Sequence, residues 1–142
     1  MKIALKSIPV VIAFLLAGCV WSGSSTYQKQ LNGSYYLDAY NDYNEMSIGI
    51  EDKEIRVGVI KATVFAVGQT NQFIVAKQHP LDESRNIDKS TTNYFIIPLN
   101  QKISKAIDRN YLGPLSFNEF NTKRHELGMG HIPFTIVFKE LE

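Results

Sequence analysis

The histidines and serines of this chain lack the spacings that catalysis and metal binding usually require. The three histidines are His79, His125 and His131. No two of them are three or four residues apart, the spacing that places two metal ligands on one helical face. The sequence contains no G-x-S-x-G elbow, no P-loop and no G-x-G-x-x-G loop. We therefore expect no catalytic site, metal or cofactor, and the least favoured alternative is a hydrolase built on His125 or His131 with a carboxylate.

Two groups of carboxylates lie close together in sequence: Glu51, Asp52 and Glu54, and Asp38, Asp42 and Glu45. The first group falls where a turn between two strands is expected, which favours solvated turn charges. The second group lacks the glycine-centred pattern of an EF-hand calcium loop. We expect no metal site at either place.

The most unusual stretch runs from Tyr35 to Asn44 and contains four tyrosines among aspartates and asparagines: Tyr35, Tyr36, Tyr40 and Tyr43. Tyrosine supplies a large contact area at low entropic cost, which is typical of recognition surfaces. Only alternate side chains of a strand can face the core, so Tyr35 and Tyr36 should point to opposite faces. The alternative is that some tyrosines are core and the rest flank a turn. We predict these four residues as candidate partner-binding residues.

Composition narrows the class of protein. The chain has 142 residues, the size of one domain. Its 15 basic and 14 acidic side chains give a net charge of +1, which excludes a polybasic nucleic-acid binder. The single cysteine excludes an intrachain disulfide and a cysteine-based zinc cluster.

The amino-terminal residues are typical of an export signal. Lys2 and Lys6 precede an apolar run, Ile8 to Leu16, which is shorter than the roughly 20 residues that a membrane span needs. The run ends in Leu16-Ala17-Gly18-Cys19, with the only cysteine at the last position. This motif resembles the lipobox of bacterial lipoproteins. The alternative is an ordinary signal peptide with a chance cysteine.

The resemblance implies cleavage between Gly18 and Cys19, diacylation of the Cys19 sulfur with palmitate-like chains, and acylation of the new amino terminus. Membrane attachment would run through these acyl chains, since two or more chains anchor a protein stably. Val20 replaces the aspartate that favours inner-membrane retention. The implied location is the outer membrane facing the periplasm in a Gram-negative source, or the plasma membrane in a Gram-positive one.

These observations predict three regions: a signal peptide at 1–18, a lipidated cysteine with a short polar tether at 19–31, and a single globular domain at 32–142. The domain also resembles small bacterial lipoproteins of uncharacterised function, on the stretches Val64–Gly68, Phe73–Pro80 and Gly113–Ser116. That resemblance implies no activity.

Alternating apolar residues predict antiparallel strands in the first part of the domain. The alternation from Ile55 to Val67 changes phase near Gly58, which indicates a β-bulge or a bend in a long strand. Gly68–Asn71 predicts a hairpin turn before a strand at Phe73–Lys77. Residues His79 to Thr92 should form an exposed loop, and the next strand should run from Tyr94 to Leu99.

The last third of the sequence changes to helical spacing. Ile103, Ile107 and Tyr111 predict a helix that starts near Asn100 and stops at Gly113-Pro114. Ser116 and Glu119 form a capping box for a second helix from about Phe117 to Leu127. A final strand should follow Pro133, with Phe134, Ile136 and Phe138 on one face and Thr135 and Val137 on the other. We expect an α+β fold: an antiparallel meander sheet of five to six strands with two C-terminal helices on one face and a final strand.

The sequence therefore predicts a lipid-anchored, non-enzymatic cell-envelope protein that binds another envelope protein. An immunity or inhibitor protein is one concrete form of this function. The alternative is an accessory or assembly lipoprotein of an envelope or secretion complex.

Overall fold

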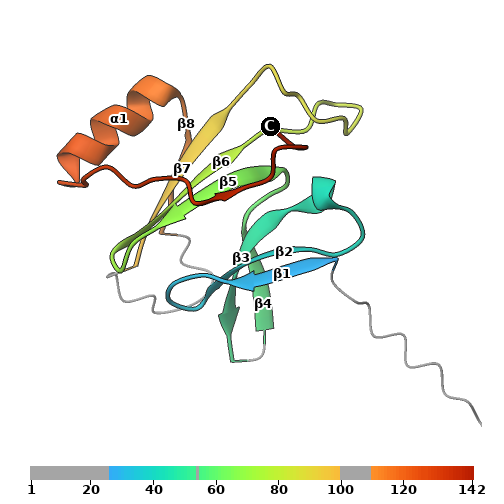
Figure 1. Cartoon of the computed structure of the whole chain (residues 1–142), viewed down its shortest axis with the longest axis horizontal. Helices are drawn as coiled ribbons and strands as arrows, with labels where there is room; N and C mark the ends of the chain where they lie inside the picture. Colours follow the sequence, from blue (N-terminus) through green and yellow to red (C-terminus); the bar gives the residue numbers. More distant parts are fainter. Residues whose placement is uncertain (1–25, 54, 100–109) are drawn as a thin grey trace, which may run out of the picture.

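The computed structural model describes residues 26–53, 55–99 and 110–142, which form two antiparallel sheets and one α-helix (Figure 1). The first sheet has the order β1 (Tyr27–Gln30), β2 (Tyr35–Ala39), β3 (Ser47–Asp52) and β4 (Ile55–Ile60). A short 3-10 turn, η1 (Tyr43–Glu45), connects β2 to β3. The second sheet has the order β8 (Leu112–Leu115), β7 (Asn93–Pro98), β6 (Phe73–Gln78), β5 (Val64–Gln69) and β9 (Ile136–Val137). The helix α1 (Phe117–Glu126) follows β8.

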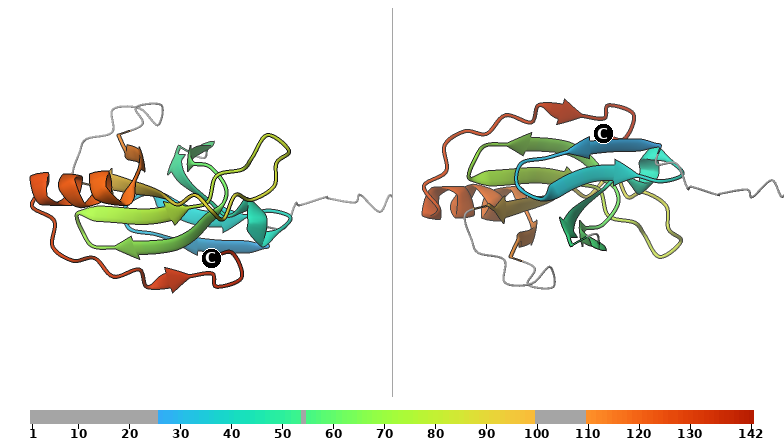
Figure 2. Two further views of the ribbon diagram at one scale, coloured as in Figure 1. Left: turned by 90° about the horizontal axis from the view of Figure 1, so that it is seen from above. Right: turned by 90° about the horizontal axis from the view of Figure 1, so that it is seen from below.

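Alternating side chains of the second sheet face two different layers. Phe95 and Ile97 of β7 pack with residues of the first sheet in the main core. Ile96, between them, packs with Val75 and with Phe120 of α1 in a smaller cluster. The second sheet is therefore the middle layer, and α1 lies at one end of it while the C-terminal segment runs back along β5 (Figure 2).

The strand predicted from Ile55 to Val67 is in fact two strands in two sheets. The predicted bulge is confirmed, because Ile48 pairs with Ile60 and Gly49 with Gly58, which leaves Val59 unpaired. After β4 the chain crosses to the second sheet and continues as β5. Two hydrogen bonds of 3.0 Å from Gln78 Nε2 to the carbonyls of residues 61 and 62 hold this crossover.

This crossover corrects the predicted sheet. The α+β class and the antiparallel pairing are confirmed, but the single meander sheet is wrong. A continuous sheet of these strands would leave one apolar face uncovered. Folding β5 to β7 over the first sheet buries both faces against each other.

The predicted helix α1 is confirmed together with its capping box. Ser116 Oγ accepts a hydrogen bond from Glu119 N at 3.3 Å, and Glu119 Oε2 accepts one from Ser116 N at 2.8 Å. The other predicted helix lies mainly in residues 100–109, outside the described residues. Its predicted stop, Gly113-Pro114, lies inside strand β8, because this segment pairs with β7. Two C-terminal helices on one face are thus not what the described residues form.

Both ends of the described chain add a strand to a sheet. β1 precedes the predicted domain start at Asn32 and pairs with β2 from Tyr27 to Gln30, so part of the predicted tether belongs to the first sheet. β9 pairs with β5 over two residues and is shorter than the predicted final strand. Its alternation is as predicted, since Val137 is exposed and Phe138 is buried.

Candidate functional site

The four tyrosines predicted as binding residues occupy three different environments. Tyr35 is 4% exposed and belongs to the core between the sheets. Tyr36 is also 4% exposed, although it points to the other face of the first sheet. Tyr40 and Tyr43 are 48% and 38% exposed. Only Tyr40 and Tyr43 are therefore available to a partner without a rearrangement.

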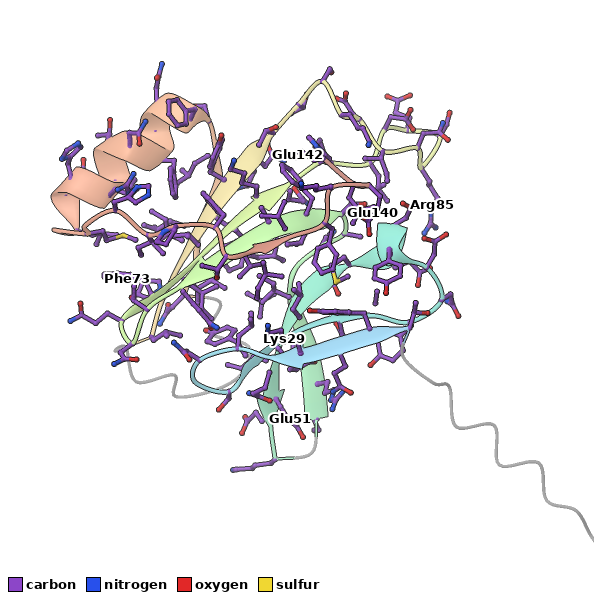
Figure 3. The ribbon with its side chains drawn as sticks, viewed as in Figure 1. Lys29, Glu51, Phe73, Arg85, Glu140 and Glu142 are labelled. Carbon is purple, nitrogen blue, oxygen red and sulfur yellow. The ribbon has the colours of Figure 1, made fainter. Side chains whose placement is uncertain are left out.

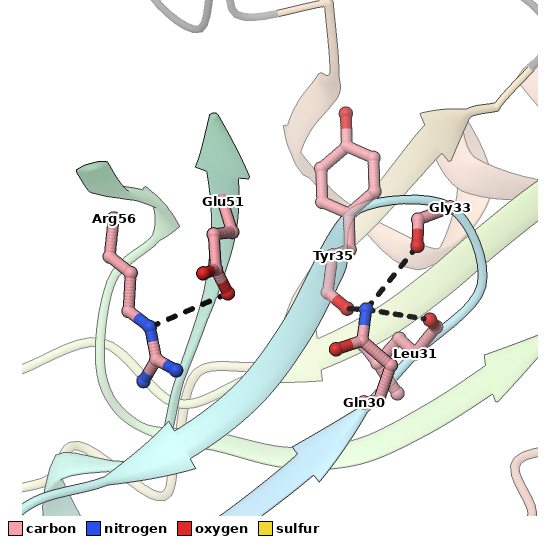
Figure 4. A network of polar contacts seen from close by, with 6 residues as sticks. All are labelled: Gln30, Leu31, Gly33, Tyr35, Glu51 and Arg56. Carbon is pink, nitrogen blue, oxygen red and sulfur yellow. Dashed lines mark hydrogen bonds and ion pairs between the residues drawn. The ribbon is translucent and has the colours of Figure 1, made fainter. Parts of the chain in front are cut away.

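Tyr36 is buried because two other strands enclose its ring. The Arg56 guanidinium lies 4.8 Å from the ring centroid, on one side. Gly49 of β3 also lies against the ring, since an added Cβ there would lie 2.5 Å from the Tyr36 hydroxyl oxygen. Arg56 also forms an ion pair with Glu51 at 3.7 Å (Figure 4). Long side chains thus close over a face that the alternation predicts to be exposed.

The hairpin between β1 and β2 is held by one amide. Gln30 Nε2 donates to the carbonyl oxygens of Leu31, Gly33 and Tyr35 at 3.4, 3.3 and 2.9 Å (Figure 4). Gly33 has a φ of 69°, a left-handed conformation that glycine adopts readily. These contacts fix the position of β2, which carries Tyr35 and Tyr36.

The residues around Tyr36 form a polar network with shifted pKa values. Burial raises the pKa of Tyr36 to about 12, and the nearby Asp38 charge adds to the shift. Burial also raises the pKa of Asp38, against the opposing effect of a 3.2 Å hydrogen bond from Ser47 Oγ. The pKa of Arg56 is raised, mainly by its side-chain hydrogen bond with Tyr40. The network links the buried Tyr36 to the exposed Tyr40.

Tyr40 and Tyr43 lie on a braced turn, residues 40–45, which we call the tyrosine turn. Asp42 Oδ1 accepts from Asn44 N at 2.9 Å, and Glu45 Oε2 accepts from Asn41 N at 3.3 Å. These bonds hold the loop in one conformation, as Asx turns do. The turn therefore presents its tyrosines at little further cost in conformational entropy.

The ring of Tyr43 also packs on two other aromatic rings. Its centroid lies 6.2 Å from that of Tyr27 and 6.0 Å from that of Phe138. Tyr27 and Phe138 contact each other edge to face, with centroids 5.2 Å apart. The tyrosine turn thus lies on an aromatic cluster that joins β1 to the C-terminal segment.

The chain leaves the described structure next to the tyrosine turn. Thr26 N and Thr26 Oγ1 both donate to the carbonyl oxygen of Tyr40, at 3.2 and 2.9 Å. In Figure 1 the start of β1 and η1 lie at the same end of the molecule. The described part of the chain therefore begins beside this surface.

A cleft of about 720 Å³ lies between β4 and the second sheet. Its wall is mostly apolar, and it includes the carboxamides of Gln78 and Asn93, which are joined by a 3.0 Å hydrogen bond. The apolar lining comes from segments far apart in the sequence: Val59, Ile60, Leu81, Phe95, Tyr111 and Pro114. No local pattern in the sequence indicates such a cleft, because only the packing of the two sheets assembles it.

The histidines do not converge on a common site. His79, predicted as a solvated loop residue, is 4% exposed, so that prediction is wrong. Its ring stacks on Phe65 with centroids 4.2 Å apart, and its Nδ1 lies 2.7 Å from the Thr91 carbonyl oxygen. His125 and His131 are exposed, on α1 and after it. Among the described residues no group of three or more histidine, cysteine or acidic side chains could hold a metal ion.

The structure defines an α+β domain of two packed antiparallel sheets and a helix, with an exposed tyrosine turn at one end. A family model described as "Protein of unknown function (DUF3997)" matches residues 32–142. The chain belongs to this family. Neither the curated proteins nor the solved structures include a match. Within the described ranges, no helix has the length and apolar character of a membrane span.

Proposed function

We propose that this protein is a lipid-anchored, non-enzymatic protein of the cell envelope that binds another protein through the tyrosine turn. The observation that carries the proposal is the exposure of Tyr40 and Tyr43 on a loop that is already braced. Exposed tyrosines on rigid supports are frequent binding hot spots. Asp42 and Glu45 place two carboxylates in the same turn, where residues 40–45 include no basic side chain. A complementary partner surface would carry lysine or arginine.

The position of the turn supports an anchored role. Six residues separate Cys19 from Thr26, and the seven Cα–Cα steps between them reach at most about 25 Å when fully extended. Thr26 is hydrogen-bonded to Tyr40, so acyl chains on Cys19 would hold the tyrosine turn close to the membrane surface. The proposed partner is therefore a protein at the same membrane, such as a toxin that an immunity lipoprotein neutralises. An accessory role in an envelope complex is the alternative, and the identity of the partner distinguishes the two.

Site-specific photo-crosslinking in intact cells tests the binding surface. A photoreactive amino acid replaces Tyr40 or Tyr43 in the full chain, and Phe117 serves as the matched control. Phe117 is 58% exposed but lies on α1, away from the tyrosine turn. We expect a discrete adduct from positions 40 and 43 and none from 117. Absence of an adduct at 40 and 43, or the same adducts at all three positions, would contradict the proposal.

The anchor is tested separately by metabolic labelling with an alkyne analogue of palmitate. Cys19 is the only cysteine of the chain, so Cys19→Ser should abolish labelling of the sulfur and release the protein from the membrane fraction. Labelling that persists in Cys19→Ser would show that the lipid is attached elsewhere.

A further inference from the structure

The edge of the first sheet at β4 is open. In the described part of the chain β4 pairs with β3 and with no other strand. The far end of the β3–β4 hairpin projects beyond β1 and β2 (Figure 1). Ile55 lies there and is 66% exposed, more than any other large apolar side chain of the described residues. Exposed apolar edge strands are rare unless another chain pairs with them.

The hydrogen-bonding groups that face outward from β4 can be identified from the pairing. Glu51 N donates to the carbonyl of Ser34, on the β2 side of β3. Because the two sides of a strand alternate, the residues next to Glu51 bond to β4, and one of them pairs with Val57. The N–H and C=O groups of Arg56 and Gly58 then point away from the sheet. The open edge therefore offers two donors and two acceptors.

The sequence of this edge is complementary to itself. When two copies of β4 run antiparallel with Val57 opposite Val57, Ile55 of one copy lies opposite Val59 of the other, and Arg56 lies opposite Gly58. We propose that two copies of this chain pair through β4 about a two-fold axis at Val57. The N–H and C=O groups of Arg56 in each copy then bond to those of Gly58 in the other copy, which gives four hydrogen bonds. The two four-stranded sheets become one continuous eight-stranded sheet.

The side chains fit this arrangement on both faces. No atom lies within 4 Å of the position that a Cβ on Gly58 would occupy, so the stem of Arg56 from the second copy has room there. On the inner face the exposed Ile55 gains an apolar neighbour, Val59 of the second copy. The bulge at Val59 ends the regular pairing.

The pairing involves one short strand from each copy, which buries less surface than the roughly 1,200 Å² of a standard stable interface. We therefore expect a weak dimer, and the test must capture a transient complex. The dimer uses neither the tyrosine turn nor Cys19, so it is independent of the proposed function.

Disulfide trapping tests the pairing and its register. The full chain carries Cys19→Ser, so that one introduced cysteine is the only thiol. In the proposed dimer the two copies of residue 57 directly oppose each other, with Cα atoms roughly 4.5–5.5 Å apart, within the range of a disulfide. The two copies of residue 55 are four positions apart, about 14 Å. With diamide as the oxidant, Val57→Cys should form a covalent dimer and Ile55→Cys should not.

A mixed experiment guards against misfolding of the half-buried Val57→Cys variant. Arg56→Cys and Gly58→Cys, at exposed positions that oppose each other in the proposed dimer, should form more disulfide-linked dimer when mixed in equal amounts than either variant forms alone. Circular dichroism and thermal unfolding establish that each variant is folded. Equal dimer formation by Val57→Cys and Ile55→Cys, or no disulfide from Val57→Cys and from the mixture, would overturn the proposed dimer.

Discussion

Gln28 and Arg56 lie on the two opposite edge strands of the first sheet, and their side chains nevertheless meet. With the Gln28 amide oxygen turned toward Arg56, it accepts hydrogen bonds from both Nη atoms at 2.7 and 2.8 Å. Three strand spacings separate β1 from β4, or about 14 Å in a flat sheet. The two long side chains therefore bridge the sheet from edge to edge, and the Arg56 guanidinium lies over the ring of Tyr36. This closure explains how Tyr36 is buried on the outer face.

Replacement of Gly49 by alanine should disrupt this closure. The new Cβ would lie 2.5 and 2.6 Å from two atoms of Tyr36, so the ring must move away from its site. We expect a loss of stability of about 1–3 kcal/mol, as for other overpacked sites. Gly58→Ala is the matched control, because Gly58 pairs with Gly49 and has no atom within 4 Å of its Cβ position. Equal urea midpoints for the two variants would contradict the enclosed position of Tyr36.

The closure should also require the planar head group of Arg56. A lysine cannot bond Gln28 with two donors and approach Glu51 at the same time. Arg56→Lys should therefore lower the urea midpoint. The matched control is Arg85→Lys, because Arg85 lies in the loop between β6 and β7, far from Glu51 (Figure 3). An Arg56→Lys midpoint equal to that of the control would show that the planar guanidinium contributes nothing to stability.

Stability should fall at high pH because of Tyr36. Its pKa rises from 10.0 to about 12 on folding, so the folded chain binds the phenolic proton more tightly than the unfolded chain. The resulting stabilisation is fully present below pH 10 and is lost as the pH rises through about 12. Tyr27 and Tyr35 also have raised pKa values and act in the same direction.

Comparison with Tyr36→Phe isolates the contribution of Tyr36. Unfolding free energies measured across this pH window should decline less steeply in the variant, which has no phenol at this position. Parallel curves for the two proteins would mean that Tyr36 ionises with the same pKa in the folded and unfolded chain.

Loss of the capping box should destabilise the region around α1. Ser116→Ala removes the acceptor for Glu119 N and should cost about 1 kcal/mol. The variant Asn118→Ala, at an exposed position of the same helix, should change stability much less. Thermal unfolding of both variants measures the difference, and a larger effect of Asn118→Ala would contradict the assigned cap.

Local signals made several elements predictable from the sequence. Ser116 and Glu119 indicated the start of α1, because a cap depends on residues three positions apart. The phase change near Gly58 indicated the bulge, because one extra residue in a strand shifts the alternation of the side chains that follow it. The sequence also placed Tyr35 and Tyr36 on opposite faces. These features involve neighbours in the chain, so they can be read without the fold.

Long-range contacts were not predictable in the same way. His79 follows a strand and precedes Pro80, which indicated a loop, yet stacking on Phe65 buries it. The ion pair of Glu51 and Arg56 was not predicted either, because it depends on the register between β3 and β4. The cleft beside β4 gave no signal, because its walls come from both sheets.

The sequence by itself determined the strand alternation, the bulge, the capped helix and the positions of the tyrosines, since each depends on residues close together in the chain. The tertiary structure decided which tyrosines are exposed. Packing of the second sheet buried Tyr35, and closure of Arg56 over the first sheet buried Tyr36. Tyr40 and Tyr43 stayed exposed because their turn lies at the end of the molecule. Burial depends on contacts between distant segments, and those contacts exist only once both sheets have formed.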